Sequence, residues 1–296
     1  MRAAAILGLG CSQKNLRPFQ TDETIDWHIG MPAADAADII LIFGGDGTIH
    51  RHLNQLVKLG LPLLVVPAGS GNDFASALGL ARVRDSLAAW RQFCATQDNV
   101  SAIDLGFVTP LAVAGGAPAP HGHYFCSVAS VGLDAEVSRR AHTLPRWLRA
   151  HGGYALTLAP TIFRFAPVPV KILARDESGR WTAGSDKHTL LAAFANTSTY
   201  GGGMKIAPNA RLDDGRLDIC VIAGVNPFKL FCMFPTVYFG RHLTIRGVEF
   251  FQAAHIRVET ETPLDVYADG EFVCQTPAEI SLQPRALKVL TPRPEC

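Results

Sequence analysis

The sequence has no excess of charge of either sign and no long hydrophobic run. Its 27 Lys and Arg residues are balanced by 26 Asp and Glu residues, for a formal net charge of +1. A protein that coats nucleic acid has a strongly basic surface, so no nucleic-acid partner is predicted. No segment approaches the roughly 18 consecutive apolar residues of a transmembrane helix, so no spanning helix is predicted.

Cysteine is sparse and follows no redox or metal-binding pattern. The seven Cys residues are scattered, and no pair has C-x-x-C spacing. Cys126, Cys220 and Cys232 lie in apolar surroundings typical of buried free thiols. This usage predicts the reducing cytoplasm. Residues 1–11 look superficially like a lipoprotein signal, but their apolar region is short, so we interpret them as a first β-strand.

Two apolar runs each end in a glycine-rich turn. Residues 39–43 lead into the turn 44–48 (GGDGT), and residues 63–67 lead into the turn 69–75 (GSGNDFA). Such runs are typical of buried parallel strands, whose carboxyl ends form ligand sites. Glycine lets backbone N–H groups approach a phosphate, and a helix predicted over 48–57 would point its N-terminus there. No Lys-Ser/Thr pair follows the glycines, which excludes a Walker A loop.

The chain changes character after its first third. With 296 residues, 48% of them hydrophobic, it can form two domains with substantial cores. Residues 1–103 alternate apolar runs with helical patterns, which predicts an α/β domain, and residues 285–296 are expected to pack back on it. Residues 104–284 are mostly antiparallel β, with helices around 135–165 and 227–240. The strands predicted there are 103–108, 123–131, 168–174, 188–195, 217–223, 255–259, 264–268, 271–274 and 279–282.

Together the two turns resemble the diacylglycerol kinase catalytic-domain family of lipid kinases. That family's signature is GGDGT followed by a loop of the type G-(S/T)-x-N-D-F-A, and segments 124–137, 200–218 and 269–271 match further family motifs. Two places depart from the pattern: Ser127 replaces the usual Asn, and residues 11–15 replace the family's N-P-x-S-G loop. The first β-α-β unit is therefore shortened or rebuilt, which puts the adenine and ribose contacts in question.

The resemblance implies an α/β nucleotide-binding domain of the NAD-kinase and diacylglycerol-kinase type, followed by a β-sandwich domain for the lipid substrate. ATP and Mg²⁺ are the implied cofactors. Both turns would hold the ATP phosphates, through Gly44, Gly45, Asp46, Gly47, Thr48, Gly69, Ser70, Gly71, Asn72 and Asp73.

The resemblance also implies catalytic residues. Glu271 would accept the proton of the lipid hydroxyl, and Asp104 and Asp269 would be active-site carboxylates. Asp269 and Gly270 are also a strong two-residue hairpin signal, which explains both residues without a catalytic role.

A structural Mg²⁺ is implied at a polar turn. Its ligands would be the Asp214 side chain and the backbone carbonyls of Arg211 and Arg216, and oxygen ligands of this kind suit a hard cation.

Local roles compete with the implied ones at several polar residues. Asp46 could cap the helix that begins at Thr48, and Asp73 has the same two readings. Ser70 could be an ordinary loop hydroxyl, and Asp104 could simply face solvent. The sequence leaves these alternatives open.

A membrane-facing surface is expected in the second half. Residues 138–149 hold four Arg residues (Arg139, Arg140, Arg146 and Arg149) and Trp147, a pattern that suits an anionic bilayer but also an ordinary solvated helix pair. Residues 228–234 form an apolar stretch that could border a lipid path or lie in the core.

The resulting hypothesis is a cytoplasmic ATP-dependent lipid kinase that associates peripherally with the inner face of the membrane. Diacylglycerol is the first expected substrate; a sphingoid base, ceramide or another glycerolipid stays open, as does a homodimer. One alternative is an NAD kinase, which shares the G-G-D-G turn. The other is a lipid-binding or regulatory protein that has lost ATP turnover, suggested by the missing N-P-x-S-G loop.

Overall fold

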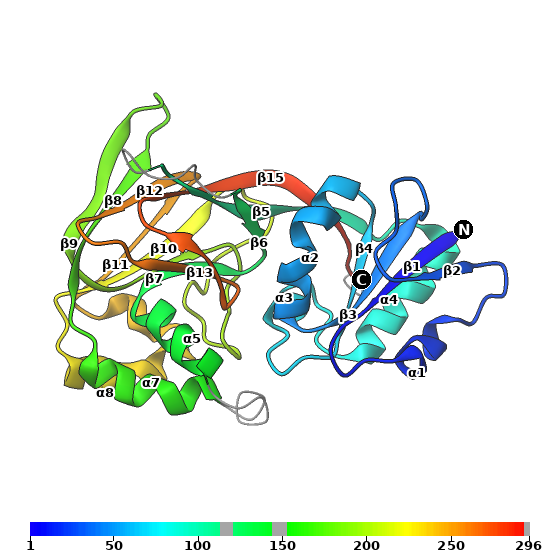
Figure 1. The fold of residues 1–296 in the computed structure, drawn as a ribbon, viewed down its shortest axis with the longest axis horizontal. Coiled ribbons are helices and arrows are strands. Elements are labelled where there is room, and N and C mark those ends of the chain that lie inside the picture. The colour runs from blue at the N-terminus through cyan, green and yellow to red at the C-terminus, as the bar shows by residue number, and fades with distance from the viewer. Residues whose placement is uncertain (113–120, 144–152, 293–296) are drawn as a thin grey trace. The chain divides into compact units, whose positions relative to one another are not determined.

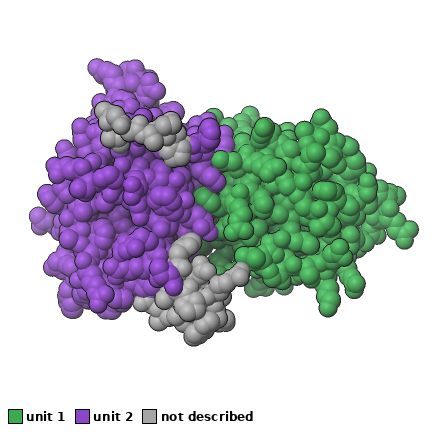
Figure 2. Space-filling model, in the orientation of Figure 1, with its two compact units in different colours: residues 1–105, 284–296 green, residues 106–283 purple. Residues whose placement is uncertain are grey.

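The computed structural model describes residues 1–112, 121–143 and 153–292 (Figure 1). The chain divides into two compact units (Figure 2). Unit 1 contains Met1–Leu105 and Pro284–Cys296, and unit 2 contains Gly106–Gln283.

Unit 1 is built on a parallel sheet with the strand order β2-β1-β3-β4. Its strands are β1 (Arg2–Leu7), β2 (Asp26–Ile29), β3 (Ile39–Gly44) and β4 (Leu63–Pro67). Every residue of β3 and β4 is buried, as expected for central strands of a parallel sheet. The last strand, β15 (Ala278–Leu290), extends the sheet because Val289 pairs in parallel with Leu63 of β4.

The helices of unit 1 present one apolar face to this sheet. The longest are α2 (Asp46–Leu59) and α4 (Val83–Thr96), with α3 (Asp73–Ala77) between them. The first β-α-β unit is short, as the sequence indicates. A single helical turn, α1 (Gln13–Leu16), and a 3₁₀ turn (Arg17–Phe19) connect β1 to β2.

Unit 2 is antiparallel. Strand β5 (Val100–Pro110) enters it from unit 1 and forms a hairpin with β6. The tip of that hairpin, residues 113–120, lies outside the described residues. The other strands are β6 (His123–Phe125), β7 (Val128–Gly132), β8 (Val168–Arg175), β9 (Trp181–Ala195), β10 (Leu217–Ala223), β11 (Val248–Ala253), β12 (His255–Thr260), β13 (Asp265–Ala268) and β14 (Glu271–Gln275).

The second half of β9 (residues 189–195) and all of β10 are buried on both faces. On one face Phe194 and Ile219 join the core between the layers of the sandwich. On the other face Ala193 and Cys220 join a second core beneath the helices. This double burial explains why residues 190–195 and most of β10 are apolar, without the alternation of a half-exposed strand.

Three helices cover that second core: α5 (Leu133–Thr143), α7 (Gly153–Arg164) and α8 (Pro227–Val237), followed by a 3₁₀ turn (Arg241–Thr244). They gather on one side of unit 2 (Figure 1). Val137, Ile162, Leu230 and Met233 pack into the core from them. The predicted fold class, an α/β domain followed by a β-sandwich, is confirmed.

Some elements differ from the sequence prediction. Strands β2 and β11 were not predicted, and β9 begins at Trp181 rather than at 188. Residues 181–187 contain mostly polar or small side chains and are largely exposed, so no apolar pattern marks them. Strand β2 is only four residues long and mostly exposed, which leaves too short a pattern to identify. Cys126 and Cys220 are buried as predicted, and burial raises the pKa of the Cys220 thiol to about 12. Cys232, which was also expected to be buried, is exposed.

The sandwich core should respond strongly to truncation. Phe194 is completely buried between the layers, so Phe194→Ala should lower the free energy of unfolding by about 3–5 kcal/mol. Phe228→Ala is the matched control, because Phe228 is 70% exposed and its loss should cost less than about 0.5 kcal/mol. Chemical denaturation followed by circular dichroism compares them. Equal effects would contradict the assignment of this core.

Candidate functional site

The two glycine turns lie side by side at the ends of adjacent strands. Strands β3 and β4 pair in parallel, with Gly44 opposite Pro67. The turns that follow are in backbone contact: a Cβ added to Gly45 would lie 2.8 Å from the Cα of Gly69, and one added to Gly69 would lie 2.4 Å from the Cα of Gly45. Both positions therefore require glycine for the packing of one turn on the other.

The second turn is closed by Asn72. Its Oδ1 accepts a hydrogen bond from the Gly69 N–H at 2.8 Å, and its Nδ2 donates to the Gly69 carbonyl at 2.7 Å. Asn72 has a φ of +55°, a left-handed conformation that Asn tolerates better than most residues. Ser70 and Gly71 lie on the exposed rim of this turn, and the Ser70 hydroxyl forms no hydrogen bond within the described residues.

Asp46 joins the two turns. It is the first residue of α2, and its carboxylate accepts hydrogen bonds from the N–H groups of Asp73 and Phe74, both at 3.1 Å, at the start of α3. The sequence offered a cap of the helix at Thr48 as one alternative, and these two contacts show the carboxylate at the start of another helix.

Thr48 packs beneath the first turn. A Cβ on Gly44 would lie 2.6 Å from the Thr48 Cβ, and a Cβ on Gly8 would lie 2.8 Å from the Thr48 Oγ1. Gly8, which follows β1, was not predicted as part of the site. Its position at the end of an apolar strand was the available signal. Gly47 and Thr48 are half-buried in the first turn of α2.

Asp104 is buried in unit 1, not exposed to solvent. Its Oδ1 accepts a hydrogen bond at 2.8 Å from the N–H of Arg285, a residue with a φ of +52°. The carboxylate thus holds an irregular point of β15.

The hairpin between β13 and β14 carries two of the predicted catalytic carboxylates, Asp269 and Glu271, and they differ in their contacts. Asp269 and Gly270 both have positive φ, +51° and +81°, as a two-residue type I′ turn requires. The Asp269 carboxylate accepts hydrogen bonds from the N–H groups of Cys126, Ser127 and Val128 at 2.9, 2.8 and 3.3 Å. Asp269 therefore anchors the hairpin to the start of β7.

Glu271, in contrast, does not anchor the hairpin. It is the first residue of β14, half-buried, and within the described residues its carboxylate forms no hydrogen bond or ion pair. A carboxylate without a structural partner is available to accept a proton from a bound substrate.

The predicted metal turn is exposed and locally bonded. Asp214 Oδ1 accepts from the Arg216 N–H at 3.1 Å, and the Arg211 Nε is 3.1 Å from Asp213 Oδ1. Among the described residues no group of three His, Cys, Asp or Glu side chains could hold a metal. The expected site uses one carboxylate and two backbone carbonyls, and the residues present fit such a set, so it stays a prediction.

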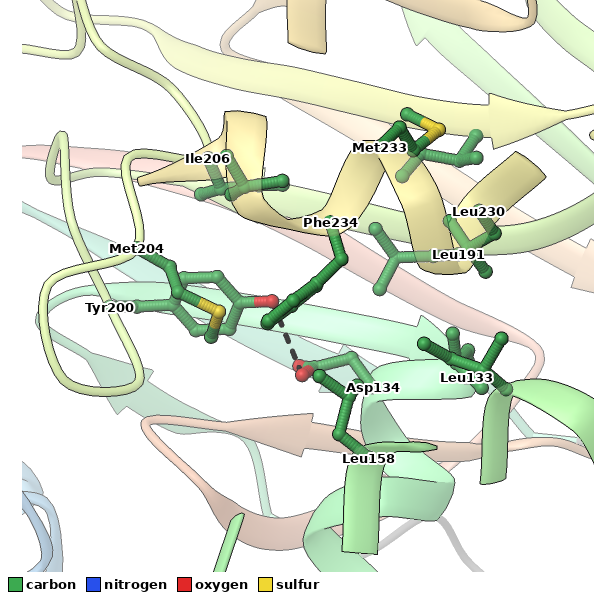
Figure 3. A pocket seen from close by; sticks show the side chains of 13 residues that line it. Leu133, Asp134, Leu158, Leu191, Tyr200, Met204, Ile206, Leu230, Met233 and Phe234 are labelled. Carbon is green, nitrogen blue, oxygen red and sulfur yellow. Dashed lines mark hydrogen bonds between the residues drawn. The ribbon is translucent and has the colours of Figure 1, made fainter. Parts of the chain in front are cut away.

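An apolar pocket lies inside unit 2, between the helices and the sheet (Figure 3). Asp134, on the first turn of α5, is its one charged lining residue. The Asp134 carboxylate accepts hydrogen bonds from the Tyr200 hydroxyl at 3.2 Å and the Ser130 hydroxyl at 2.6 Å. The remaining lining residues are Leu133, Leu158, Ile162, Leu191, Tyr200, Met204, Ile206, Ile222, Leu230, Met233, Phe234 and Val237.

Comparison with known families accounts for both units. Residues 12–108 match the diacylglycerol kinase catalytic domain, and residues 127–291 match the YegS C-terminal NAD kinase beta sandwich-like domain. The chain belongs to the diacylglycerol kinase family of lipid kinases. The match to the second domain covers more than half of the sequence.

Individual relatives agree with this assignment. A diacylglycerol kinase of Mycobacterium tuberculosis is 35% identical over 262 residues, 88% of this chain and 79% of the relative. A diacylglycerol kinase of Bacillus subtilis is 27% identical over 260 residues, 86% and 78% of the two chains.

Solved structures share the fold. A diacylglycerol kinase from Bacillus anthracis has a TM-score of 0.65 at 19% identity and covers 98% of this chain and 96% of that one. An NAD kinase from Archaeoglobus fulgidus, in complex with ATP, has a TM-score of 0.53 at 14% identity, with coverage of 100% and 94%. At these identities the likeness concerns the fold alone.

The pocket was missed from the sequence although its two polar residues stand in segments that match family motifs. Asp134 and Tyr200 are 66 residues apart, and no local pattern pairs them. The available signal was the type of the two residues. A carboxylate or a phenol that is buried among apolar neighbours needs a hydrogen-bond partner.

The basic stretch at 138–149 is less cationic than its sequence indicates. Glu136 lies 2.7 Å from the Arg139 Nε and 2.6 Å from the Arg140 Nε. Hydrogen bonds from the two guanidinium groups lower the pKa of the Glu136 carboxyl, and the bond from Arg139 has the larger effect. One carboxylate thus offsets part of the two charges, while Arg146, Trp147 and Arg149 lie outside the described residues.

The tie between the turns can be tested at Asp46. Asp46→Ala removes the acceptor of two N–H groups of α3 and should destabilise that segment by about 1–2 kcal/mol. Hydrogen exchange of the Phe74 amide should become faster by about tenfold. Asp22→Ala is the control, since Asp22 bonds only to nearby Thr24 among the described residues. Unchanged exchange at Phe74 in the Asp46 variant would remove this role.

Proposed function

We propose that this protein transfers the γ-phosphate of ATP to a hydroxyl group of a membrane lipid, with diacylglycerol as the first candidate. The observation that carries the proposal is the pair of glycine turns locked together by Gly45, Gly69 and Asp46. Family membership and the apolar pocket of unit 2 support a lipid as the acceptor.

The nucleotide phosphates belong at the glycine turns. Gly69, Ser70 and Gly71 are exposed, so the backbone N–H groups of Ser70 and Gly71 and the Ser70 hydroxyl can meet a phosphate, while the Gly69 N–H is held by Asn72. The N-terminus of the 14-residue helix α2 adds a positive dipole at the neighbouring turn. Because Asp46 is held at that point, its negative charge beside a triphosphate calls for a cation between them. Mg²⁺ carried with ATP supplies that charge, and the turn at Asp214 is proposed for a second, structural Mg²⁺.

The pocket of unit 2 is proposed to hold an apolar tail of the substrate. Its lining is apolar apart from Asp134 and the Tyr200 hydroxyl, which meet at one place (Figure 3). These polar groups can orient the polar part of a lipid. Helix α5, which carries Asp134, packs against both strands of the hairpin that presents Glu271, so the pocket and Glu271 belong to neighbouring elements of one unit.

Glu271 is proposed as the base. The lipid hydroxyl oxygen attacks the γ-phosphorus of ATP, its proton passes to the Glu271 carboxylate, and the bond from phosphorus to the leaving oxygen breaks. The products are a phosphorylated lipid and ADP. Phosphoryl transfer depends mainly on positioning and charge neutralisation, so the protein supplies little further chemistry.

A radiolabelled-ATP assay over a total lipid extract tests the proposal, because the labelled product identifies the substrate. We expect label in a lipid phosphate such as phosphatidic acid. Label on NAD would establish the NAD kinase alternative. Lipid binding without any ATP consumption would establish the regulatory alternative, in which the altered loop at 11–15 no longer serves ATP.

Glu271→Gln should lower kcat by at least about 10²-fold, because the amide cannot accept the proton. The free energy of unfolding and the affinity for ATP should stay close to the wild-type values, since Glu271 has no structural partner among the described residues. Glu261→Gln, at an exposed position in the same unit, is the matched control. Near-normal turnover in the Glu271 variant would exclude it as the base.

A substitution that fills the pocket should weaken the reaction of long-chain lipids more than that of short-chain lipids. Met233→Trp places a bulky ring among the lining residues and should raise KM for long-chain diacylglycerol about tenfold, while a short-chain analogue keeps its kcat/KM. Thr182→Trp adds a similar ring at an exposed position of the same unit and serves as the control. Equal effects on both substrates would show that the tail binds elsewhere.

A further inference from the structure

Helix α8 is apolar on both of its faces. Leu230, Met233 and Val237 face inward and are buried. The opposite face carries Phe228, Phe231 and Cys232, all exposed. A surface helix of a globular protein usually presents polar residues to water, so this outer face is unusual.

Exposed aromatic side chains gather around that face. Of the nine large hydrophobic side chains exposed in the described part of the chain, five lie on α7, α8 or directly after α8. Phe228 and Phe239 are 70% and 73% exposed, and the rings of Phe163 and Phe231 pack 5.6 Å apart between the two helices. We call this set the α8 aromatic surface: Phe163, Phe228, Phe231, Tyr238 and Phe239.

The segment that contains α8 and the residues around it carries charge of one sign. Residues 219–248 contain Lys229, Arg241 and Arg246 but no Asp or Glu. Within the described residues none of these three bases forms an ion pair, although the Lys229 Nζ donates to the Arg246 carbonyl at 2.9 Å. A protein with a net charge of only +1 therefore has a local basic rim beside an aromatic patch.

We propose that the α8 aromatic surface docks this protein on an anionic lipid bilayer. Aromatic rings favour the interface between headgroups and acyl chains, and uncompensated bases favour anionic headgroups. The surface also lies next to the apolar pocket, because Phe234 lines the pocket and its ring packs 5.8 Å from the ring of Tyr238. A lipid that reaches the pocket from the bilayer would meet these apolar rings first; this last step rests on the proposed function.

This placement differs from the one expected from the sequence. In the stretch at 138–149, Arg139 and Arg140 form ion pairs with Glu136, whereas among the described residues the three bases beside α8 form none. The aromatic contribution also differs, since several rings act together at α8. A bilayer accepts such a spread of rings without the close shape match that a protein partner needs.

Sedimentation with vesicles of phosphatidylcholine and phosphatidylglycerol, without nucleotide, tests the docking surface. Phe228→Gln/Phe239→Gln should weaken vesicle binding at least about tenfold, whereas the control Ile29→Gln/Val83→Gln, at exposed apolar positions of unit 1, should not. Arg241→Gln/Arg246→Gln should weaken binding about fivefold per charge at low salt, and Lys58→Gln/Arg91→Gln should not. Circular dichroism checks that each variant is folded.

The outcomes separate the two proposals. Vesicle binding that is absent in the wild type, or unchanged in both α8 variants, overturns the docking surface. A dimer that dissociates in the Phe228/Phe239 variant while vesicle binding persists also overturns it, since the face would then bind a second copy of the chain. Glu271→Gln should bind vesicles normally. If dispersed short-chain diacylglycerol is not phosphorylated but vesicle binding behaves as expected, the kinase proposal fails and the docking surface stands.

Discussion

Strands β9 and β10 carry apolar side chains on both faces, and each face must be covered. The second layer of the sandwich covers one face, where Phe194 and Ile219 lie. Helices α5, α7 and α8 cover the other, over Ala193 and Cys220. The pocket with Asp134 lies between these helices and the sheet, where Leu191 of β9 and Ile222 of β10 line it. The substrate pocket that we propose thus lies in the layer that shields the sheet from water.

In unit 1 the corresponding constraint is a contact between two backbones. Gly45 and Gly69 touch because β3 and β4 are adjacent and their turns leave the sheet at the same edge. Asn72 and Asp46 then fix the turns with side-chain hydrogen bonds, so the conformation does not depend on a ligand. A phosphate-binding surface that is formed in advance loses little entropy on binding. In the function that we propose, the glycines would allow both the packing of the two turns and the approach of a phosphate.

Much of this could be predicted because local sequence carries the signal. The buried strands at 39–43 and 63–67 are apolar throughout, and Asp269-Gly270 specifies its own turn. The failures involve information that is not local. For Asp46 a place at the phosphates was predicted and a cap of its own helix was the alternative; neither indicated the bonds from Asp73 and Phe74, which lie 27 and 28 residues away. Asp134 and Tyr200 meet through the tertiary fold. Cys232 was placed in the core because α8 is apolar all round, and such a pattern does not reveal which face is inside.

Unit 1 is assembled from two distant parts of the chain. Its sheet is completed when Val289 of β15 pairs with Leu63 of β4, and Arg285 bonds to Asp104 near the same junction. All of unit 2 is synthesised between these partners, so this edge of β4 has no strand beside it until β15 has been made. Pairings between distant residues also form slowly. During that interval the apolar strand β4 is open to pairing with other chains, and the yield of folded protein depends on how quickly β15 arrives.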